Sequence, residues 1–104
     1  MKRTVAIAFT LALAALPAAA AAQGKVSDDV VRIGVLTDMT GYYSDLAGPG
    51  SVLAVQMAVA DFGGKVLGKP IEVISADHQN KADIASNTAR KWFDENKVDT
   101  IVDL

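Results

Sequence analysis

The sequence predicts an α/β fold with a parallel sheet and the element order β-α-β-α-β. Three runs rich in β-branched residues, at residues 30–36, 71–76 and 98–102, alternate with two segments in which apolar residues recur at helical spacing. Strands joined through helices favour right-handed crossovers, which make neighbouring strands parallel and place the helices against the sheet.

The first strand and the first helix have distinct patterns. Residues 30–36 read VVRIGVL, a nearly continuous apolar run that suits a strand covered on both faces. Helical spacing of apolar residues predicts a helix over residues 51–62. Gly63 and Gly64 are expected to end this helix, because glycine readily takes the left-handed conformation found at helix ends. The segment KVLGKP, residues 65–70, is expected to be a turn.

The second helix has candidate residues for both of its ends. After the strand at residues 71–76, Asn80 stands where an N-cap would be, and the charge of Asp83 suits the positive end of the helix dipole. The helix is expected to end near Glu95, with Asn96 as a left-handed cap before the third strand.

The chain ends with Asp103 and Leu104, immediately after the third predicted strand, so we expect it to be a fragment. A doubly wound sheet needs further strands to bury its helices, and a fragment would leave an edge strand unpaired and apolar surface exposed. The alternative is a complete small domain of three strands and two helices. An exported chain that ends on a strand makes this alternative less favourable.

Residues 1–22 have the pattern of a cleavable secretory signal peptide. A positive MKR start precedes the apolar run VAIAFTLALAAL, and Ala20 and Ala22 have the spacing required for cleavage before Gln23. The apolar run is well short of the roughly 20 residues of a membrane-spanning helix. We therefore expect export to the periplasm and a mature segment of residues 23–104.

The composition of the mature segment argues against several classes of function. Eight Lys or Arg residues face twelve Asp or Glu residues, a formal net charge of −4, so no basic surface for nucleic acid is expected. The absence of cysteine excludes disulfides, thiolate metal sites and thiol catalysis within these residues. A single histidine gives little support to acid-base catalysis or a histidine metal site. We therefore expect that the protein is not an enzyme and that it binds neither a metal nor a cofactor.

The connection after the first strand is the first candidate for a binding site. Ligands of open parallel sheets bind outside the carboxyl ends of the strands. Tyr42 and Tyr43 lie in this long connection and offer flat apolar area with a hydroxyl at the tip, which suits a small, partly apolar molecule. Polar groups that could orient the ligand are those of Thr40, Ser44, Asp45 and Ser51, the last at the N-terminal end of the first helix.

Asp77 and His78 follow the second strand and could line the same crevice. Simpler interpretations stand beside these assignments: one tyrosine ring packs on the sheet edge, Ser51 is an N-cap, and His78 is a hydrogen-bonded edge residue. Residues 48–50, Gly-Pro-Gly, lack the third glycine of a dinucleotide fingerprint, and the proline removes an amide that would face phosphate.

Residues 31–104 resemble the start of a periplasmic solute-binding protein of the branched-chain amino acid type, the leucine-binding-protein-like receptor of an ABC importer. Two stretches carry the resemblance, IGVLTDMTGYYSDLAGPGSVLAVQMAVADFGG and VLGKPIEVISADHQNKADIASNTARKWFDENKVDTIVDL. Where many members carry Asp-Asp-Gln, this chain has Asp77, His78 and Gln79. The sequence TDMTGYYSDLAGPGS is similar to those of a subgroup associated with aromatic or other organic acids.

The resemblance implies the first lobe of a two-lobed type I periplasmic binding protein, of which residues 23–104 would be a part. Such a protein closes on a hinge around a small amino acid or an aromatic or organic acid and docks on an inner-membrane ABC permease. It would be a monomer at full length and would not be an enzyme. Its ligand contacts carry over only to the first loop, chiefly to Tyr42 and Tyr43.

Three other hypotheses stay open at this point. A periplasmic sensor domain shares the lobe but continues into a membrane segment and a signalling partner. An exported α/β enzyme would need a nucleophile or an acid-base pair after later strands. A truncated product would have no activity at all.

Overall fold

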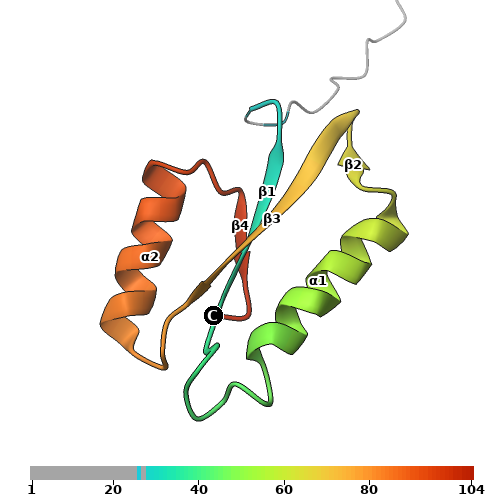
Figure 1. Cartoon of the computed structure of the whole chain (residues 1–104). Helices are drawn as coiled ribbons and strands as arrows, with labels where there is room; N and C mark the ends of the chain where they lie inside the picture. Colours follow the sequence, from blue (N-terminus) through green and yellow to red (C-terminus); the bar gives the residue numbers. More distant parts are fainter. Residues whose placement is uncertain (1–25, 27) are drawn as a thin grey trace, which may run out of the picture.

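The computed structural model of the chain describes residue 26 and residues 28–104. Its elements, in chain order, are β1 (Val31–Thr37), α1 (Gly48–Phe62), β2 (Lys65–Val66), β3 (Lys69–Asp77), α2 (Ala82–Asp94) and β4 (Thr100–Val102) (Figure 1). The predicted signal peptide, residues 1–22, lies outside the described residues.

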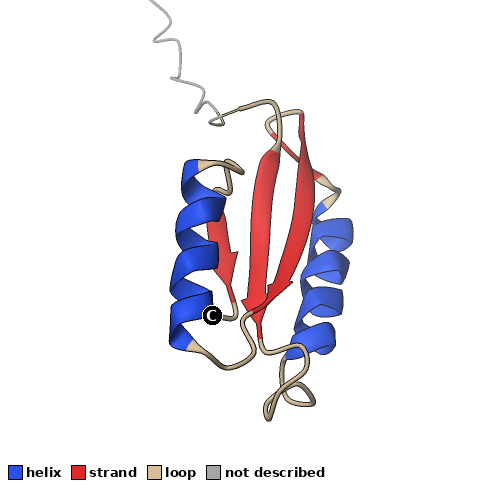
Figure 2. Ribbon diagram, turned by 60° about the vertical axis from the view of Figure 1, so that its left-hand side comes forward, coloured by secondary structure: helices blue, strands red, loops and turns tan. Residues whose placement is uncertain are grey.

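The strands form one sheet in the order β2-β3-β1-β4. β1 is central and pairs in parallel with both β3 and β4, while the short β2 pairs antiparallel with β3. Helix α1 lies on one side of the sheet and α2 on the other (Figure 2). The predicted α/β fold with a parallel sheet is therefore confirmed, with β2 as an added element.

Successive side chains of β1 point to opposite faces of the sheet, so they face α1 and α2 in turn. Ile33 faces α1, whereas Gly34 faces the indole ring of Trp92 in α2. Leu36, Trp92 and Val98 form the buried core on the α2 side. β4 begins at Thr100 rather than at residue 98 as predicted, because the N–H of Val98 donates to the Trp92 carbonyl of α2 at 3.1 Å instead of to a neighbouring strand.

Helix α1 begins three residues earlier than predicted. Pro49 sits in its first turn, where a missing N–H is not needed, and the Gly48 N–H donates to Oγ1 of Thr37 at 3.1 Å. Ser51 is therefore inside the helix, and the prediction that it opens the helix is wrong. Gly63 ends α1 in the left-handed conformation, as predicted, with a φ of 105°.

The segment predicted as a turn, residues 65–70, is a short hairpin. β2 and β3 are joined by Leu67 and Gly68, whose φ angles of 50° and 79° are both positive. Two central residues with positive φ are the signature of the mirror-image turns that match the twist of two-residue hairpins. β3 accordingly starts at Lys69, two residues before the predicted strand.

Two of the predicted caps of α2 are wrong by one residue. The N-cap is Lys81, without a side-chain capping bond, and Asn80 lies outside the helix with a φ of 54°. Asp83 does lie in the first turn. At the other end the left-handed residue is Lys97, with a φ of 53°, instead of Asn96. Asn80 thus takes a left-handed conformation that asparagine favours, whereas Lys97 takes one although lysine is not a preferred residue there.

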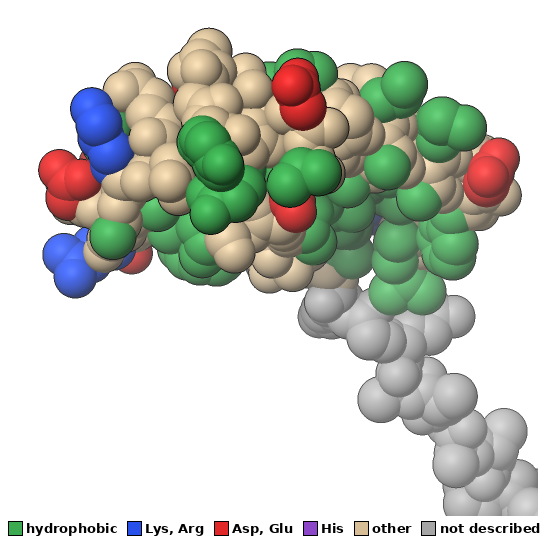
Figure 3. Space-filling model, turned by 90° about the horizontal axis from the view of Figure 1, so that it is seen from below, with side chains coloured by type: hydrophobic (Ala, Val, Ile, Leu, Met, Phe, Trp, Pro, Cys, Tyr) green, Lys and Arg blue, Asp and Glu red, His purple; other side chains and the backbone are tan. Residues whose placement is uncertain are grey.

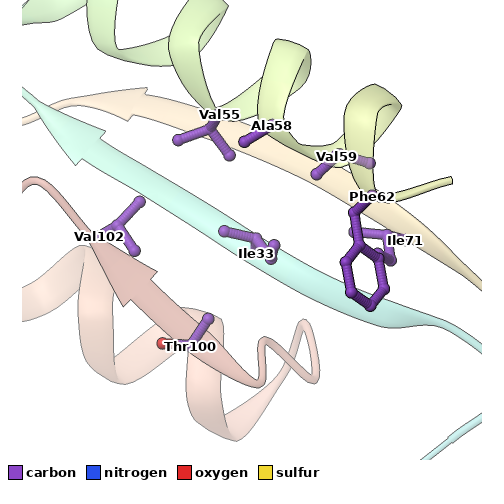
Figure 4. A pocket seen from close by; sticks show the side chains of 8 residues that line it. All are labelled: Ile33, Val55, Ala58, Val59, Phe62, Ile71, Thr100 and Val102. Carbon is purple, nitrogen blue, oxygen red and sulfur yellow. The ribbon is translucent and has the colours of Figure 1, made fainter. Parts of the chain in front are cut away.

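Apolar surface is left open between α1 and the sheet. A groove runs there, and its eight lining residues are Ile33, Val55, Ala58, Val59, Phe62, Ile71, Thr100 and Val102 (Figure 4). β4 is the edge strand of the described sheet, and its Thr100 and Val102 form one wall of this groove. In the described part of the chain, neither helix has the length and apolar character needed to cross a membrane.

Candidate functional site

The carboxyl ends of β1, β3 and β4 lie at one edge of the sheet, because the three strands are parallel. The loop of residues 38–47 leaves β1 at this edge and leads into α1 (Figure 1). Figure 3 looks onto this edge and shows hydrophobic side chains gathered on the side of α1. The predicted location of the long loop is therefore confirmed.

Tyr42 and Tyr43 form an edge-to-face pair on this loop. Their ring centroids are 5.1 Å apart and the ring planes are inclined at 83°, an arrangement that aromatic rings favour. Tyr42 is 87% exposed and Tyr43 is 47% exposed. The pair thus presents apolar ring surface to solvent at the edge where ligands of parallel sheets bind.

Asp77 links the ends of β1 and β3. Its Oδ1 accepts the Met39 N–H at 2.9 Å and the Gln79 N–H at 2.8 Å, and its Oδ2 accepts the Thr40 hydroxyl at 2.6 Å. The hydrogen bond from Thr40, followed by that from the Met39 N–H, lowers the pKa of Asp77 below its ordinary value. Asp77 and Thr40, both predicted as ligand residues, are brought together and bonded to each other.

Asp38 organises the next part of the loop. It directly follows β1 and is only 2% exposed. Its Oδ1 accepts the Gly41 N–H at 2.6 Å and its Oδ2 accepts the Tyr43 N–H at 2.9 Å. The sequence interpretation did not include Asp38 among the site residues. Its signal was an aspartate directly after a strand, a residue type that often bonds the backbone N–H groups that follow it.

Ser44, Asp45 and Ser51 have different surroundings. The Ser44 hydroxyl donates to the Gly41 carbonyl at 2.9 Å and closes a turn of the loop. Asp45 is exposed. Ser51 lies in α1 beyond the first four N–H groups, which are the ones without partners inside a helix. Of the residues before it at the helix start, Pro49 has no N–H, and the N–H groups of Ala47 and Gly48 donate to the Tyr43 carbonyl at 3.0 Å and to Oγ1 of Thr37 at 3.1 Å.

His78 is a half-buried edge residue with its own backbone partners. Its Nδ1 accepts the Asn80 N–H at 2.9 Å, and its own N–H donates to the Thr37 carbonyl at 2.9 Å. It also lines a shallow hollow with Lys81, Ala85 and Leu104. The imidazole thus shapes the turn that leads from β3 towards α2.

The arrangement as a whole is a preformed loop that carries two exposed rings. Two carboxylates, those of Asp38 and Asp77, accept backbone N–H groups of the loop and fix its course from neighbouring strands. Among the described residues, no three His, Cys, Asp or Glu side chains are grouped so that they could hold a metal ion. Such a surface can contact a partly apolar molecule through the rings.

Comparison with known proteins decides the family. A family model described as periplasmic binding protein matches residues 30–104. The chain belongs to the periplasmic binding protein family. A search of the curated proteins returned no match.

Several solved periplasmic binding proteins are similar to the chain. One from Burkholderia mallei is 60% identical over 70% of this chain, with a TM-score of 0.69. A branched-chain amino acid ABC transporter periplasmic ligand-binding protein from Burkholderia xenovorans LB400 is 55% identical over 71% of this chain, also with a TM-score of 0.69. An ABC transporter solute-binding protein from Rhodopseudomonas palustris BisB5, solved with 3,4-dihydroxybenzoic acid, is 28% identical over 71%, with a TM-score of 0.61.

The matched part is the start of a type I periplasmic binding protein lobe, and the predicted family is confirmed. The chain covers 20% of the length of each of these three solved relatives.

Proposed function

We propose that the protein is the solute-binding receptor of an ABC importer and that the loop of residues 38–47 forms one wall of its binding cleft. The single observation that carries the proposal is the exposed Tyr42 and Tyr43 pair at the carboxyl edge of the sheet. Exposure of two rings on a loop held by hydrogen bonds has no purpose in the packing of the described core, but it suits contact with a small molecule.

The proposed solute is a small amino acid or an aromatic or other organic acid. Two exposed aromatic rings offer apolar surface to a partly apolar ligand. The solved relative with 3,4-dihydroxybenzoic acid and the relative described as a branched-chain amino acid binding protein support these two classes. Thr40, Ser44, Asp45, Ser51, Asp77 and His78 stay predictions as ligand-contacting residues.

Isothermal titration calorimetry on the full-length protein, with leucine and with 3,4-dihydroxybenzoate, tests the proposal. We expect the wild type to bind one of these probes and the double variant Tyr42→Ala/Tyr43→Ala to bind at least about tenfold more weakly, which corresponds to about 1.4 kcal/mol or more. Phe93→Ala is the matched control, because Phe93 is an exposed aromatic residue on α2. Equal affinity of the double variant and the wild type would remove the tyrosines from the site.

We further propose that the mature protein acts in the periplasm and delivers its solute to an inner-membrane permease. The family match and the signal-peptide pattern of residues 1–22 support this location. The intact mass of the protein recovered from the periplasmic fraction should correspond to a chain that begins at Gln23. Recovery of the uncleaved chain from the cytoplasm would contradict the proposed location.

A further inference from the structure

Asp38 has the properties of a residue that shapes a site without contacting the ligand. It is buried, yet it lies outside the apolar core, and its carboxylate points into the loop that carries the tyrosines. Both oxygens accept backbone N–H groups, one from Gly41 and one from Tyr43. The N–H groups on both sides of Tyr42 are therefore tied to a single side chain.

This bonding matters because the ring of Tyr42 has few other constraints. The side chain is 87% exposed, and the ring contact described for it is the one with Tyr43. The direction of an exposed side chain on a loop follows from its backbone conformation. By fixing that backbone, the Asp38 carboxylate also fixes the relative position of the two rings.

The loop backbone packs closely around Asp38. A Cβ built on Gly41 would lie 2.5 Å from Oδ1 and 2.6 Å from Oδ2 of Asp38. A Cβ built on Gly48, which has a φ of 55°, would lie 2.8 Å from the Asp38 carbonyl oxygen. A side chain at position 41 would push against the Asp38 carboxylate, and one at position 48 would push against the Asp38 backbone carbonyl, so both glycines are needed for this arrangement.

We propose that Asp38 is a positioning residue of the solute site, which holds Tyr42 and Tyr43 in the arrangement that contacts the solute. This inference rests on the proposed solute-binding function. A loop that is already ordered before binding loses less conformational freedom on binding, so preorganisation by Asp38 raises affinity without any contact between Asp38 and the solute.

The test uses Asp38→Ala and Asp38→Asn in the full-length protein. Alanine removes both accepting oxygens, whereas asparagine keeps one of them. With 3,4-dihydroxybenzoate or leucine as the probe, we expect Asp38→Ala to weaken binding at least about tenfold and Asp38→Asn to weaken it less. Asp61→Ala is the control, because it removes an exposed aspartate from α1 and should leave the affinity unchanged.

A spectroscopic readout separates positioning from general stability. In protein labelled with 3-fluorotyrosine, the ¹⁹F resonances of the two rings are assigned with Tyr42→Phe and Tyr43→Phe. Without solute, we expect two resonances with distinct chemical shifts in the wild type. The difference between the two chemical shifts should become small in Asp38→Ala and should decrease less in Asp38→Asn. If Asp38→Ala does not fold, Asp38→Asn alone decides the matter.

The outcomes distinguish this inference from the function on which it rests. If the wild type binds neither probe, the proposed function is contradicted, while the ¹⁹F resonances still report whether Asp38 sets the ring positions. If the wild type binds a probe and the folded Asp38 variants bind it equally well, the positioning role is overturned. Weaker binding with unchanged resonances also overturns it.

Discussion

Gly34 of β1 lies against the indole ring of Trp92 of α2, so closely that a Cβ on Gly34 would lie 2.6 Å from Cε3 of the indole. Trp92 is itself buried, with Leu36 and Val98 as its neighbours in the core. The ring therefore has little room to move away. This contact sets how closely α2 approaches the centre of the sheet.

We expect Gly34→Ala to lower the free energy of unfolding of the full-length protein by about 1–3 kcal/mol, the usual range for overpacking a core. Urea unfolding measures the change. Gly50→Ala is the matched control, because a Cβ there would meet no atom within 4 Å apart from its chain neighbours and the backbone of its own helix, and alanine favours the helix. The penalty of Gly34→Ala should shrink in a Trp92→Leu background, and a constant penalty would argue against the contact.

The hydrogen bonds of Asp77 predict a pH dependence of stability. Its pKa is lowered in the folded protein, first by the Thr40 hydroxyl, from an ordinary value of 3.8. The stabilisation is therefore complete above pH 3.8 and is lost as the pH falls through the lower, folded pKa. Asp77→Asn lacks this ionisable group, so the stability difference between the wild type and the variant should be full at neutral pH and shrink below that value.

Urea unfolding of the wild type and Asp77→Asn over a series of pH values provides the measurement. Glu72→Gln is the control, since it removes a carboxylate from the same strand that is bonded to Arg32 rather than to the loop. A stability difference that does not change between neutral and acidic pH would show that ionised Asp77 does not hold the loop.

The turn between β2 and β3 offers a stabilising substitution. Leu67 has a φ of 50° and is 64% exposed, so a side chain that disfavours the left-handed conformation makes little compensating contact. Asparagine tolerates this conformation and is preferred in such turns. We expect Leu67→Asn to raise the free energy of unfolding by about 0.5–1 kcal/mol.

Thermal unfolding of the full-length protein measures this effect. Gly68→Ala, at the neighbouring position with a φ of 79°, should act in the opposite direction by about 1 kcal/mol. If Leu67→Asn and Gly68→Ala shift the midpoint in the same direction, the mirror-image turn is the wrong description of this hairpin.

The sheet and its helices could be predicted because their patterns reflect burial. The apolar run of β1 is covered by α1 and α2, and the sequence pattern requires such cover. The ends of the helices and strands were harder to predict. Val98 is a residue type common in strands, but its N–H donates to the Trp92 carbonyl of α2. Asn80 and Lys97 take left-handed conformations that depend on the path of the neighbouring chain.

The candidate site shows the same division. The position of Tyr42 and Tyr43 at the carboxyl edge followed from the element order, because parallel strands end on one side. The bonding of Thr40 to Asp77 and the burial of Asp38 could not be predicted in this way, because they depend on how the loop folds back on two strands. Residue type indicates that a side chain can bond, but only the loop conformation decides its partner.

The carboxylates that frame the loop bond mainly to backbone N–H groups, which every residue except proline possesses. Replacing the aromatic side chains at positions 42 and 43 leaves those anchors in place. In the proposed site, the identity of the solute can consequently change through these two positions while the hydrogen-bonded loop beneath them keeps its course.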